Sequence, residues 1–382
     1  MVEEKQKPEW TPPESGPEFA SHVVKGVEGV HDGLPEQSRQ DRSQSRPDVL
    51  TPRRRQLSVD DHVQGVLNGD RAILARTITL IESNAPAHLE MAQEVLKQLL
   101  PHTGQSIRVG ITGVPGVGKS TFIEVLGCYL CEQGHHLAVL AVDPSSSVTR
   151  GSILGDKTRM VRLAREPHAF IRPSPTGGTL GGVTRKSRET ILVCEAAGFD
   201  VILVETVGVG QSEVTVRSMV DFFLLLMLTG AGDELQGLKK GVIELADALV
   251  INKADGDNKL RAEAAKGEYR RTLHYLTSAT EGWQTQVFTC SSLTGEGIVD
   301  IWTVIEKFRQ QTTASGIFAA RRQSQLLEWM RALITEHLQT RFFNDPGVQS
   351  ILPQVEQAVT AGKMPPTIAV QKLLNKFEEI DP

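Results

Sequence analysis

The stretch that decides the fold is Ile107–Ser120, which reads IRVGITGVPGVGKS. Its first half, Ile107–Thr112, is an apolar run of strand length, and its second half is a glycine-rich loop that ends in Lys119 and Ser120. An amphipathic helical pattern then begins near Phe122. A strand, a loop and a helix in this order are the setting that a Walker A motif requires. The sequence therefore predicts a phosphate-binding loop at the end of a buried strand.

The residue types in this loop explain why it suits phosphate. Glycines let consecutive backbone N–H groups turn around phosphate oxygens, and the helix N-terminus adds positive potential. Lys119 is expected to reach the β- and γ-phosphates, and the Ser120 hydroxyl is expected to bind Mg²⁺. A glycine-rich turn with a chance lysine fits less well, because both spacing and context match. The expected nucleotide contacts are Gly113, Val114, Pro115, Gly116, Val117, Gly118, Lys119, Ser120 and Thr121.

Short β-rich runs alternate with amphipathic helical stretches between about 105 and 310. This alternation predicts an α/β fold with a doubly wound, mostly parallel sheet, whose ligands bind beyond the carboxyl ends of the strands. The predicted strands are Ile107–Thr112, Leu137–Val142, Ala169–Arg172, Val201–Thr206, Phe222–Leu228, Ala248–Asn252 and Gln286–Cys290.

The flanks of this region have different patterns. Residues 1–58 are rich in proline and poor in large apolar residues, which predicts a disordered tail. Residues 59–102 show helical periodicity and predict a helical N-terminal subdomain packed on the P-loop domain, 103–312. Residues 313–382 predict a long helix with an apolar stripe, then helices near 348–361 and 367–378. The stripe needs a partner surface, either on its own domain or on a second copy.

The composition excludes several classes of function. The chain has 382 residues, 40% hydrophobic and 23% charged, with a net charge of -5. This balance gives no electrostatic reason to expect nucleic acid or an anionic membrane as a partner. No segment approaches the roughly 18 consecutive apolar residues of a membrane span. The four scattered cysteines indicate a reducing compartment, so we expect a cytoplasmic protein.

A second motif selects the base. Asn252, Lys253 and Asp255 follow the apolar strand that starts at Ala248. A carboxylate there accepts hydrogen bonds from both the ring N–H and the exocyclic amine of guanine, a donor pair that adenine lacks. The loop Ser291, Ser292 and Leu293 follows one more helix and strand, and its backbone amides are expected to meet the guanine carbonyl oxygen. The order of these motifs favours GTP over ATP and predicts a Mg²⁺-dependent GTPase.

Acidic residues at strand ends predict the metal and γ-phosphate side of the site. Asp143 ends an apolar strand, Asp156 lies a short loop later, and Glu205 ends another strand. These carboxylates are expected to bind Mg²⁺ directly or through water, although each alone is also typical of a helix cap. Gly208 is expected to offer its N–H to the γ-phosphate. Gln211 is a candidate to orient the attacking water, but its spacing after Gly208 leaves that role open.

Together these motifs resemble the MeaB/ArgK GTPases, relatives of MMAA within the SIMIBI class of P-loop proteins. The resemblance runs from about 59 to 345. It rests on the phosphate loop and on six further motifs, at 142–146, 155–160, 172–175, 179–183, 205–211 and 232–241.

The resemblance implies a chaperone of an adenosylcobalamin-dependent acyl-CoA mutase, of the methylmalonyl-CoA mutase type, that gates cofactor loading and protects the mutase. It also implies a homodimer joined through the C-terminal helices of 313–382. Carried over by motif, Lys119, Glu205 and Gln211 become catalytic residues. Lys239 and Lys240 become part of a switch that senses the partner.

Three alternatives stay open. The first is an ATP-dependent kinase or ATPase of the ArgK transport type, against which Asp255 argues. The second is a metal-delivery GTPase, for which Cys128 and Cys131 are the only thiolate pair, although packing on the helix after the P-loop explains them better. The third is a nucleotide-gated binding module whose hydrolysis is incidental. Because no arginine finger is evident, slow intrinsic hydrolysis is expected.

Overall fold

A computed structural model describes residues 57–83, 85–142, 160–173, 180–206, 212–230 and 241–378. In these ranges seven strands form one parallel sheet in the order β3-β2-β4-β1-β5-β6-β7. The predicted α/β fold with a doubly wound sheet is confirmed, and each predicted strand ends within one residue of its expected position. The strands are β1 (Ile107–Gly113), β2 (Leu137–Val142), β3 (Ala169–Arg172), β4 (Val201–Thr206), β5 (Phe222–Met227), β6 (Ala248–Ile251) and β7 (Gln286–Thr289).

The central strand is β1, which carries the phosphate loop at its carboxyl end. It pairs with β4 and β5, so that Ile111 lies beside Glu205 on one side and Leu224 on the other. Parallel strands that are covered on both faces consist of continuous apolar residues, and for this reason the sequence pattern predicted their positions. This register places the end of β4 directly beside the loop that follows β1.

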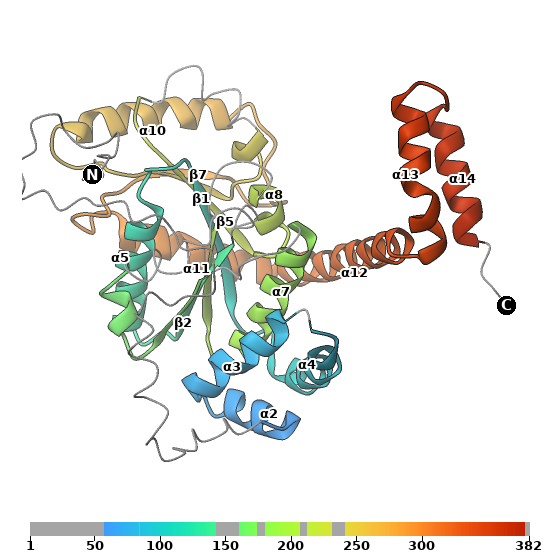
Figure 1. Ribbon diagram of the computed structural model, residues 1–382. Helices are drawn as coiled ribbons and strands as arrows, with labels where there is room; N and C mark the ends of the chain where they lie inside the picture. The colour runs from blue at the N-terminus through green and yellow to red at the C-terminus, as the bar shows by residue number, and fades with distance from the viewer. Residues whose placement is uncertain are drawn as a thin grey trace, which may run out of the picture. The chain divides into compact units, whose positions relative to one another are not determined.

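Helices cover both faces of the sheet (Figure 1). Side chains alternate along each strand, so Val139 of β2 joins one core while Ala138 and Leu140 join the other. The first core packs against α5 (Lys119–Glu132) and α11 (Ile298–Ala314), and the second against α7 (Leu180–Ala196) and α8 (Ser212–Arg217). A third core lies between α10 (Lys259–Leu273) and strands β5 to β7.

The helices α2 (Val59–Leu67), α3 (Arg71–Glu82) and α4 (Pro86–Leu99) pack on α7 and extend the second core. Side-chain oxygens of Ser58 and Asp70 accept backbone hydrogen bonds at the starts of α2 and α3, which fixes where these helices begin.

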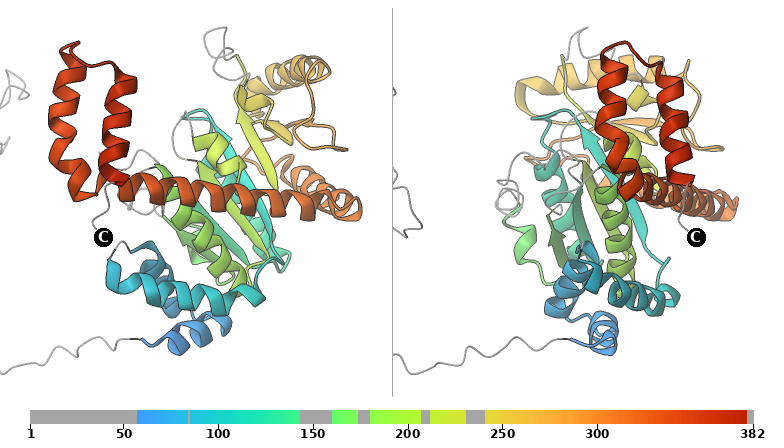
Figure 2. Two further views of the ribbon diagram at one scale, coloured as in Figure 1. Left: turned by 90° about the vertical axis from the view of Figure 1, so that its right-hand side faces the viewer. Right: turned by 45° about the vertical axis from the view of Figure 1, so that its right-hand side comes forward.

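The C-terminal helices are α12 (Ile317–Phe343), α13 (Pro346–Thr360) and α14 (Pro366–Glu378). The last two begin slightly earlier than the sequence predicted. A proline at the first helical position starts each of them, and Asp345 caps α13 by accepting from Val348 N at 2.9 Å. Figures 1 and 2 show α13 and α14 as a helical hairpin at the end of α12.

The apolar stripe of α12 is exposed to solvent in the monomer. Gln325 on the opposite face of the helix is buried, at 7% exposure, whereas every large apolar residue of the stripe but one is at least half exposed. The exposed members are Leu326, Leu327, Met330, Ile334 and Leu338. Across the described residues, no helix is both long enough and apolar enough to cross a bilayer.

Candidate nucleotide-binding site

The phosphate loop lies between the end of β1 at Gly113 and the start of α5 at Lys119. Gly118 has φ 92°, in the left-handed region, and an added Cβ there would lie 2.9 Å from Asn252 Nδ2. Only glycine suits both the backbone conformation and this close approach. The loop is therefore shaped by contact with the end of β6, 134 positions away along the chain by residue number (252 − 118).

Lys119 folds back over this loop. Its Nζ donates to the carbonyl oxygens of Gly113 at 2.8 Å and Val114 at 3.4 Å. Burial lowers the pKa of Lys119, while the negative charges of Glu205 and Glu213 oppose that shift. The two backbone carbonyls hold the Lys119 ammonium group at the loop, where it is positioned to meet an anionic ligand.

Glu205 and Ser120 meet beside the lysine. Ser120 Oγ donates to Glu205 Oε1 at 3.2 Å, and Glu205 is only 5% exposed. The next residue of β4, Thr206, donates through Oγ1 to Thr112 Oγ1 at 2.8 Å, which ties the two strand ends together. Hydroxyl and carboxylate oxygens are hard donors of the kind that Mg²⁺ prefers. The structure thus brings together two of the four residues predicted as metal ligands.

The other side of the site is built around Asn252 at the end of β6. Its Nδ2 donates to the carbonyl oxygen of Val117 at 2.9 Å. Its Oδ1 accepts from the backbone N–H of Ser292 at 3.1 Å and from the Ser292 hydroxyl at 2.8 Å. One buried amide therefore connects the phosphate loop, the end of β6 and the loop after β7.

Asp255 lies in the same loop cluster. Its Oδ2 accepts from Ser291 Oγ at 2.6 Å, and that hydroxyl in turn accepts from the N–H groups of Leu293 and Thr294. Lys253 adopts φ 61°, the single positive φ of a non-glycine residue in the described ranges. A cavity of about 230 Å³ opens here, lined by Gly118, Thr121, Asn252, Lys253, Asp255, Ser292 and Leu293.

Every lining residue of this cavity except Gly118 and Thr121 belongs to the predicted base-binding motifs, and those two belong to the predicted phosphate loop. Four predicted site residues lie outside the described residues, namely Asp143, Asp156, Gly208 and Gln211. The predicted switch lysines Lys239 and Lys240 lie outside them as well.

Sequence reasoning missed Glu213. It lies in the first turn of α8, is 5% exposed, and is one of the two carboxylates whose charge acts on Lys119. An acidic residue in a first helical turn is typical of any helix, so nothing in the local pattern distinguishes it. The only signal is its position shortly after β4, the strand that contains Glu205.

The thiolate pair considered for metal delivery is buried. Cys128 and Cys131 both lie in the core between α5 and the sheet, and burial raises the pKa of Cys131 to about 11. A buried, protonated thiol pair is a poor metal ligand. Packing explains both residues.

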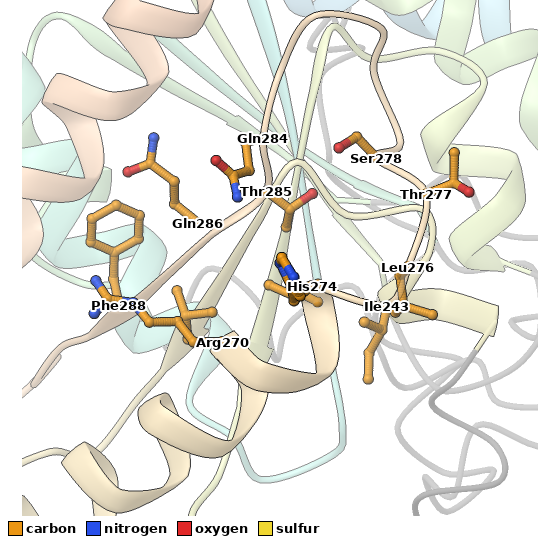
Figure 3. Close-up of a pocket in the computed structure, with 12 residues that line it drawn as sticks. Ile243, Arg270, His274, Leu276, Thr277, Ser278, Gln284, Thr285, Gln286 and Phe288 are labelled. Atoms are coloured by element: carbon orange, nitrogen blue, oxygen red, sulfur yellow. The ribbon is translucent and has the colours of Figure 1, made fainter.

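A second hollow, of about 370 Å³, lies away from this site (Figure 3). Arg270 of α10 and His274, which directly follows this helix, line it together with Gln284 and Thr285, which precede β7, and Gln286, the first residue of β7. It is therefore at the amino end of β7, whereas the predicted site residues gather at the carboxyl ends of the strands. No predicted site residue is among those that line it.

Comparison with known proteins decides the family. The family model described as "Methylmalonyl Co-A mutase-associated GTPase MeaB" matches residues 74–347. The chain belongs to the MeaB family. Membership confirms the resemblance inferred from the motifs. It also establishes that this chain is a P-loop GTPase, a hydrolase that binds guanine nucleotides.

Named relatives of this MeaB-family chain each match more than four fifths of its length. A putative GTPase of Caulobacter vibrioides is 54% identical over 321 residues, covering 84% of this chain and 98% of the relative. The mitochondrial methylmalonic aciduria type A homolog of Mus musculus is 47% identical over 333 residues, covering 85% and 80%. GTPase ArgK of Escherichia coli is 45% identical over 318 residues, covering 83% and 96%.

A solved structure agrees with this assignment. The crystal structure described as a LAO/AO transport system kinase matches with a TM-score of 0.67 and 37% identity, covering 84% of this chain and 97% of that one.

Proposed function

We propose that this MeaB-family GTPase is a chaperone for an adenosylcobalamin-dependent acyl-CoA mutase of the methylmalonyl-CoA mutase type. In this role GTP binding and hydrolysis gate cofactor loading and protect the mutase. The family match supports the proposal, since its description names association with methylmalonyl-CoA mutase. A relative named for methylmalonic aciduria adds support. The four described cysteines are free and buried, which fits work in a reducing cytoplasm.

Guanine recognition rests on Asp255. Its carboxylate lines the 230 Å³ cavity beside Gly118, where the base of a nucleotide held by the phosphate loop would enter. A carboxylate accepts from the N1–H and the 2-amino group of guanine. Ser292 and Leu293 of the loop after β7 line the same cavity, and so does Lys253. This cavity is the observation that carries the guanine preference.

The metal site is proposed at Ser120 and Glu205, with Asp143 and Asp156 as further oxygen ligands. Bound Mg²⁺ would neutralise phosphate charge during phosphoryl transfer. The Ser120 hydroxyl and the buried Glu205 carboxylate, 3.2 Å apart, supply the donor types for it.

Hydrolysis is proposed to depend on positioning. Lys119 binds the β- and γ-phosphates, Gly208 offers its N–H to the γ-phosphate, and Glu205 or Gln211 orients the attacking water. The hydrogen bonds of Lys119 to the carbonyl oxygens of Gly113, at 2.8 Å, and Val114, at 3.4 Å, hold its side chain over the loop in advance. With no arginine finger evident in the sequence, the isolated protein should turn over slowly, and mutase contact should accelerate it.

The homodimer is proposed to form through α12. Five large apolar residues are at least half exposed along one face of this 27-residue helix. An apolar face of this size that is left exposed on a helix is expected to be covered by a partner surface. A second copy of this chain supplies a matching apolar face by symmetry.

Nucleotide competition and mutase stimulation test the proposal. In Asp255→Asn, the side-chain amide donates a hydrogen bond where the carboxylate accepted one. The preference for guanine nucleotides should therefore fall about tenfold or more. The affinity for xanthine nucleotides should rise, because xanthine has a carbonyl group where guanine has its 2-amino group. The exposed neighbour Asp257→Asn is the matched control. ATP displacing bound GDP as readily as GTP does would contradict the guanine site and favour the ATPase alternative. Guanine-specific turnover that no adenosylcobalamin mutase stimulates would contradict the chaperone role.

A further inference from the structure

The short helix α8 connects the phosphate loop to the C-terminal helices. Its first turn contains Glu213, which is buried and whose charge acts on Lys119. Its last residue is Arg217, and the chain then turns through Ser218 to Asp221 before entering β5. One end of α8 therefore lies toward Lys119, and the other leads into a turn whose Asp221 contacts Arg108 near the amino end of β1.

Gln325 of α12 binds the backbone of this turn. Its Nε2 donates to the carbonyl oxygen of Val220 at 2.9 Å and to that of Arg217 at 3.5 Å. Gln325 is the only residue of α12 that is fully buried. Its amide therefore contacts the backbone both at the end of α8 and in the turn that precedes β5.

Arg188 of α7 also hydrogen-bonds to this turn. Its guanidinium donates to the Ser218 carbonyl oxygen at 2.7 Å, to Ser218 Oγ at 2.8 Å and to the Gln325 carbonyl oxygen at 3.3 Å. The same guanidinium lies 5.6 Å from the ring centroid of Trp329, one turn further along α12. A single cation thus touches the turn and two successive turns of α12.

Two further arginines hold the base of α12. Arg322 binds both carboxylate oxygens of Asp221, at 2.8 and 2.6 Å, and Arg321 donates to the Asp221 carbonyl oxygen. Asp221 also accepts from the backbone N–H of Arg108 in β1 at 2.8 Å. The turn is therefore the meeting point of the central strand, α8 and α12.

The contacts between the 217–221 turn and α12 are mostly hydrogen bonds and ion pairs between buried polar groups. Replacing buried polar groups by apolar packing is often neutral or stabilising, so their use suggests a role in selecting between arrangements. Among the described residues, the buried Nε of Arg188 and Nε1 of Trp329 have no hydrogen-bond partner in this arrangement. Buried polar atoms without partners are rare in native structures, so these two are not explained by the stability of this arrangement alone.

The exposed stripe of α12 lies on the face opposite the turn. Successive residues are rotated by about 100° around a helix, so Gln325 and Leu327 point in nearly opposite directions. A helix moves as a rigid body, so any shift imposed at Gln325 displaces the stripe residues as well.

We infer that α8 and the 217–221 turn transmit the nucleotide state of the phosphate loop to α12, with Gln325 as the positioning residue that couples them. The inference rests on the proposed function in one respect, namely that the exposed α12 stripe is the surface that a second copy of the chain binds. It adds that this surface is regulated by GTP and GDP.

Tryptophan fluorescence of the full-length protein tests the coupling. Emission is compared with GDP and with a non-hydrolysable GTP analogue bound, and Trp329→Phe assigns the signal to Trp329. The wild type should differ between the two nucleotides, and Gln325→Ala should abolish that difference. Because coupling is reciprocal, Gln325→Ala should also change the ratio of GTP-analogue to GDP affinity by about fivefold or more. Gln323→Ala, exposed on the same helix, should retain wild-type behaviour.

Three outcomes would overturn the inference: a nucleotide response that persists in Trp329→Phe, a wild type without any nucleotide response, or a Gln325→Ala protein that switches like the wild type. If Gln325→Ala does not fold, Ser218→Ala removes one Arg188 contact and should reduce the difference. These readings need no mutase and no dimer. Loss of mutase stimulation or of dimerisation would contradict the proposed function without changing them.

Discussion

Asn252 donates a hydrogen bond from Nδ2 to the carbonyl oxygen of Val117 at 2.9 Å. The same side chain accepts from Ser292 through Oδ1, so a single amide with 1% exposure sets the spacing between the phosphate loop and the Asp255 cavity. A nucleotide bound across both parts depends on that spacing. The amide is therefore a structural link between the two halves of one site.

Asn252→Ala should weaken both halves together. The substitution leaves the Val117 carbonyl and the Ser292 hydroxyl without this partner, which costs about 1–3 kcal/mol when such groups stay buried. We expect a loss of that size in urea unfolding, and weaker binding of GTP and GDP alike by calorimetry. Ser292→Ala keeps the backbone N–H donor to Asn252, so its loss should be smaller. Equal losses in the two variants would contradict the linking role.

Two loop glycines offer a matched comparison of steric contact. Gly116 and Gly118 have φ of 77° and 92°, so alanine at either position incurs the left-handed strain of about 1–2 kcal/mol. Only at Gly118 would the new Cβ meet Asn252 Nδ2, at 2.9 Å; at Gly116 there is open space. In nucleotide-free protein, Gly118→Ala should therefore lower the unfolding free energy more than Gly116→Ala. Equal destabilisation in thermal or urea melts would mean that the Gly118–Asn252 contact relaxes without cost.

The sequence predicted the sheet well because its strands are buried on both faces. Continuous apolar runs such as Leu137–Val142 have no polar position to confuse the pattern. The phosphate loop and the Asn252–Asp255 motif were found because each is a local string of residues whose spacing carries the chemistry. Site residues at 143, 156, 208 and 211 remain predictions.

The junction at the 217–221 turn could not be predicted from local patterns. Arg321 and Arg322 form a basic pair that is typical of a solvated helix, and their partner Asp221 lies 101 residues from Arg322. Glu213 likewise gains its significance only from the fold, which places it near Lys119. Tertiary contacts between distant polar residues leave no periodic signal in the chain.

His62 makes the α2–α3 contact sensitive to pH. Thr77 Oγ1 donates to the Ile73 carbonyl oxygen at 2.9 Å, so the imidazole Nδ1–H donates to that hydroxyl at 2.8 Å. Burial, reinforced by the charge of Arg76, lowers the pKa of His62 below its ordinary value of 6.5. Below that ordinary value the unfolded chain binds the proton more readily than the folded one, so stability falls as pH drops.

Urea unfolding of the wild type and of His62→Gln should reveal this proton linkage. Between pH 7.5 and 5.5 the wild type should lose stability more steeply than His62→Gln, whose amide does not titrate in this range. His88→Gln is the control, because His88 is exposed at the start of α4 and bonds only locally, to Ser83 Oγ. Parallel pH profiles for the wild type and His62→Gln would assign the pH dependence to other groups.

The exposed stripe of α12 should control oligomeric state. Leu327 and Ile334 are 52% and 51% exposed on one face of the helix, so a glutamate at either position would place a charge in an apolar interface between two copies. Leu327→Glu and Ile334→Glu should sediment as folded monomers at concentrations where the wild type is dimeric. Gln339→Glu, which adds the same charge on the opposite face, should remain dimeric. A wild type that is monomeric at every concentration would contradict a dimer through this stripe. A dimer that tolerates both substitutions would do so as well, because an interface formed by the stripe cannot bury either charge without weakening.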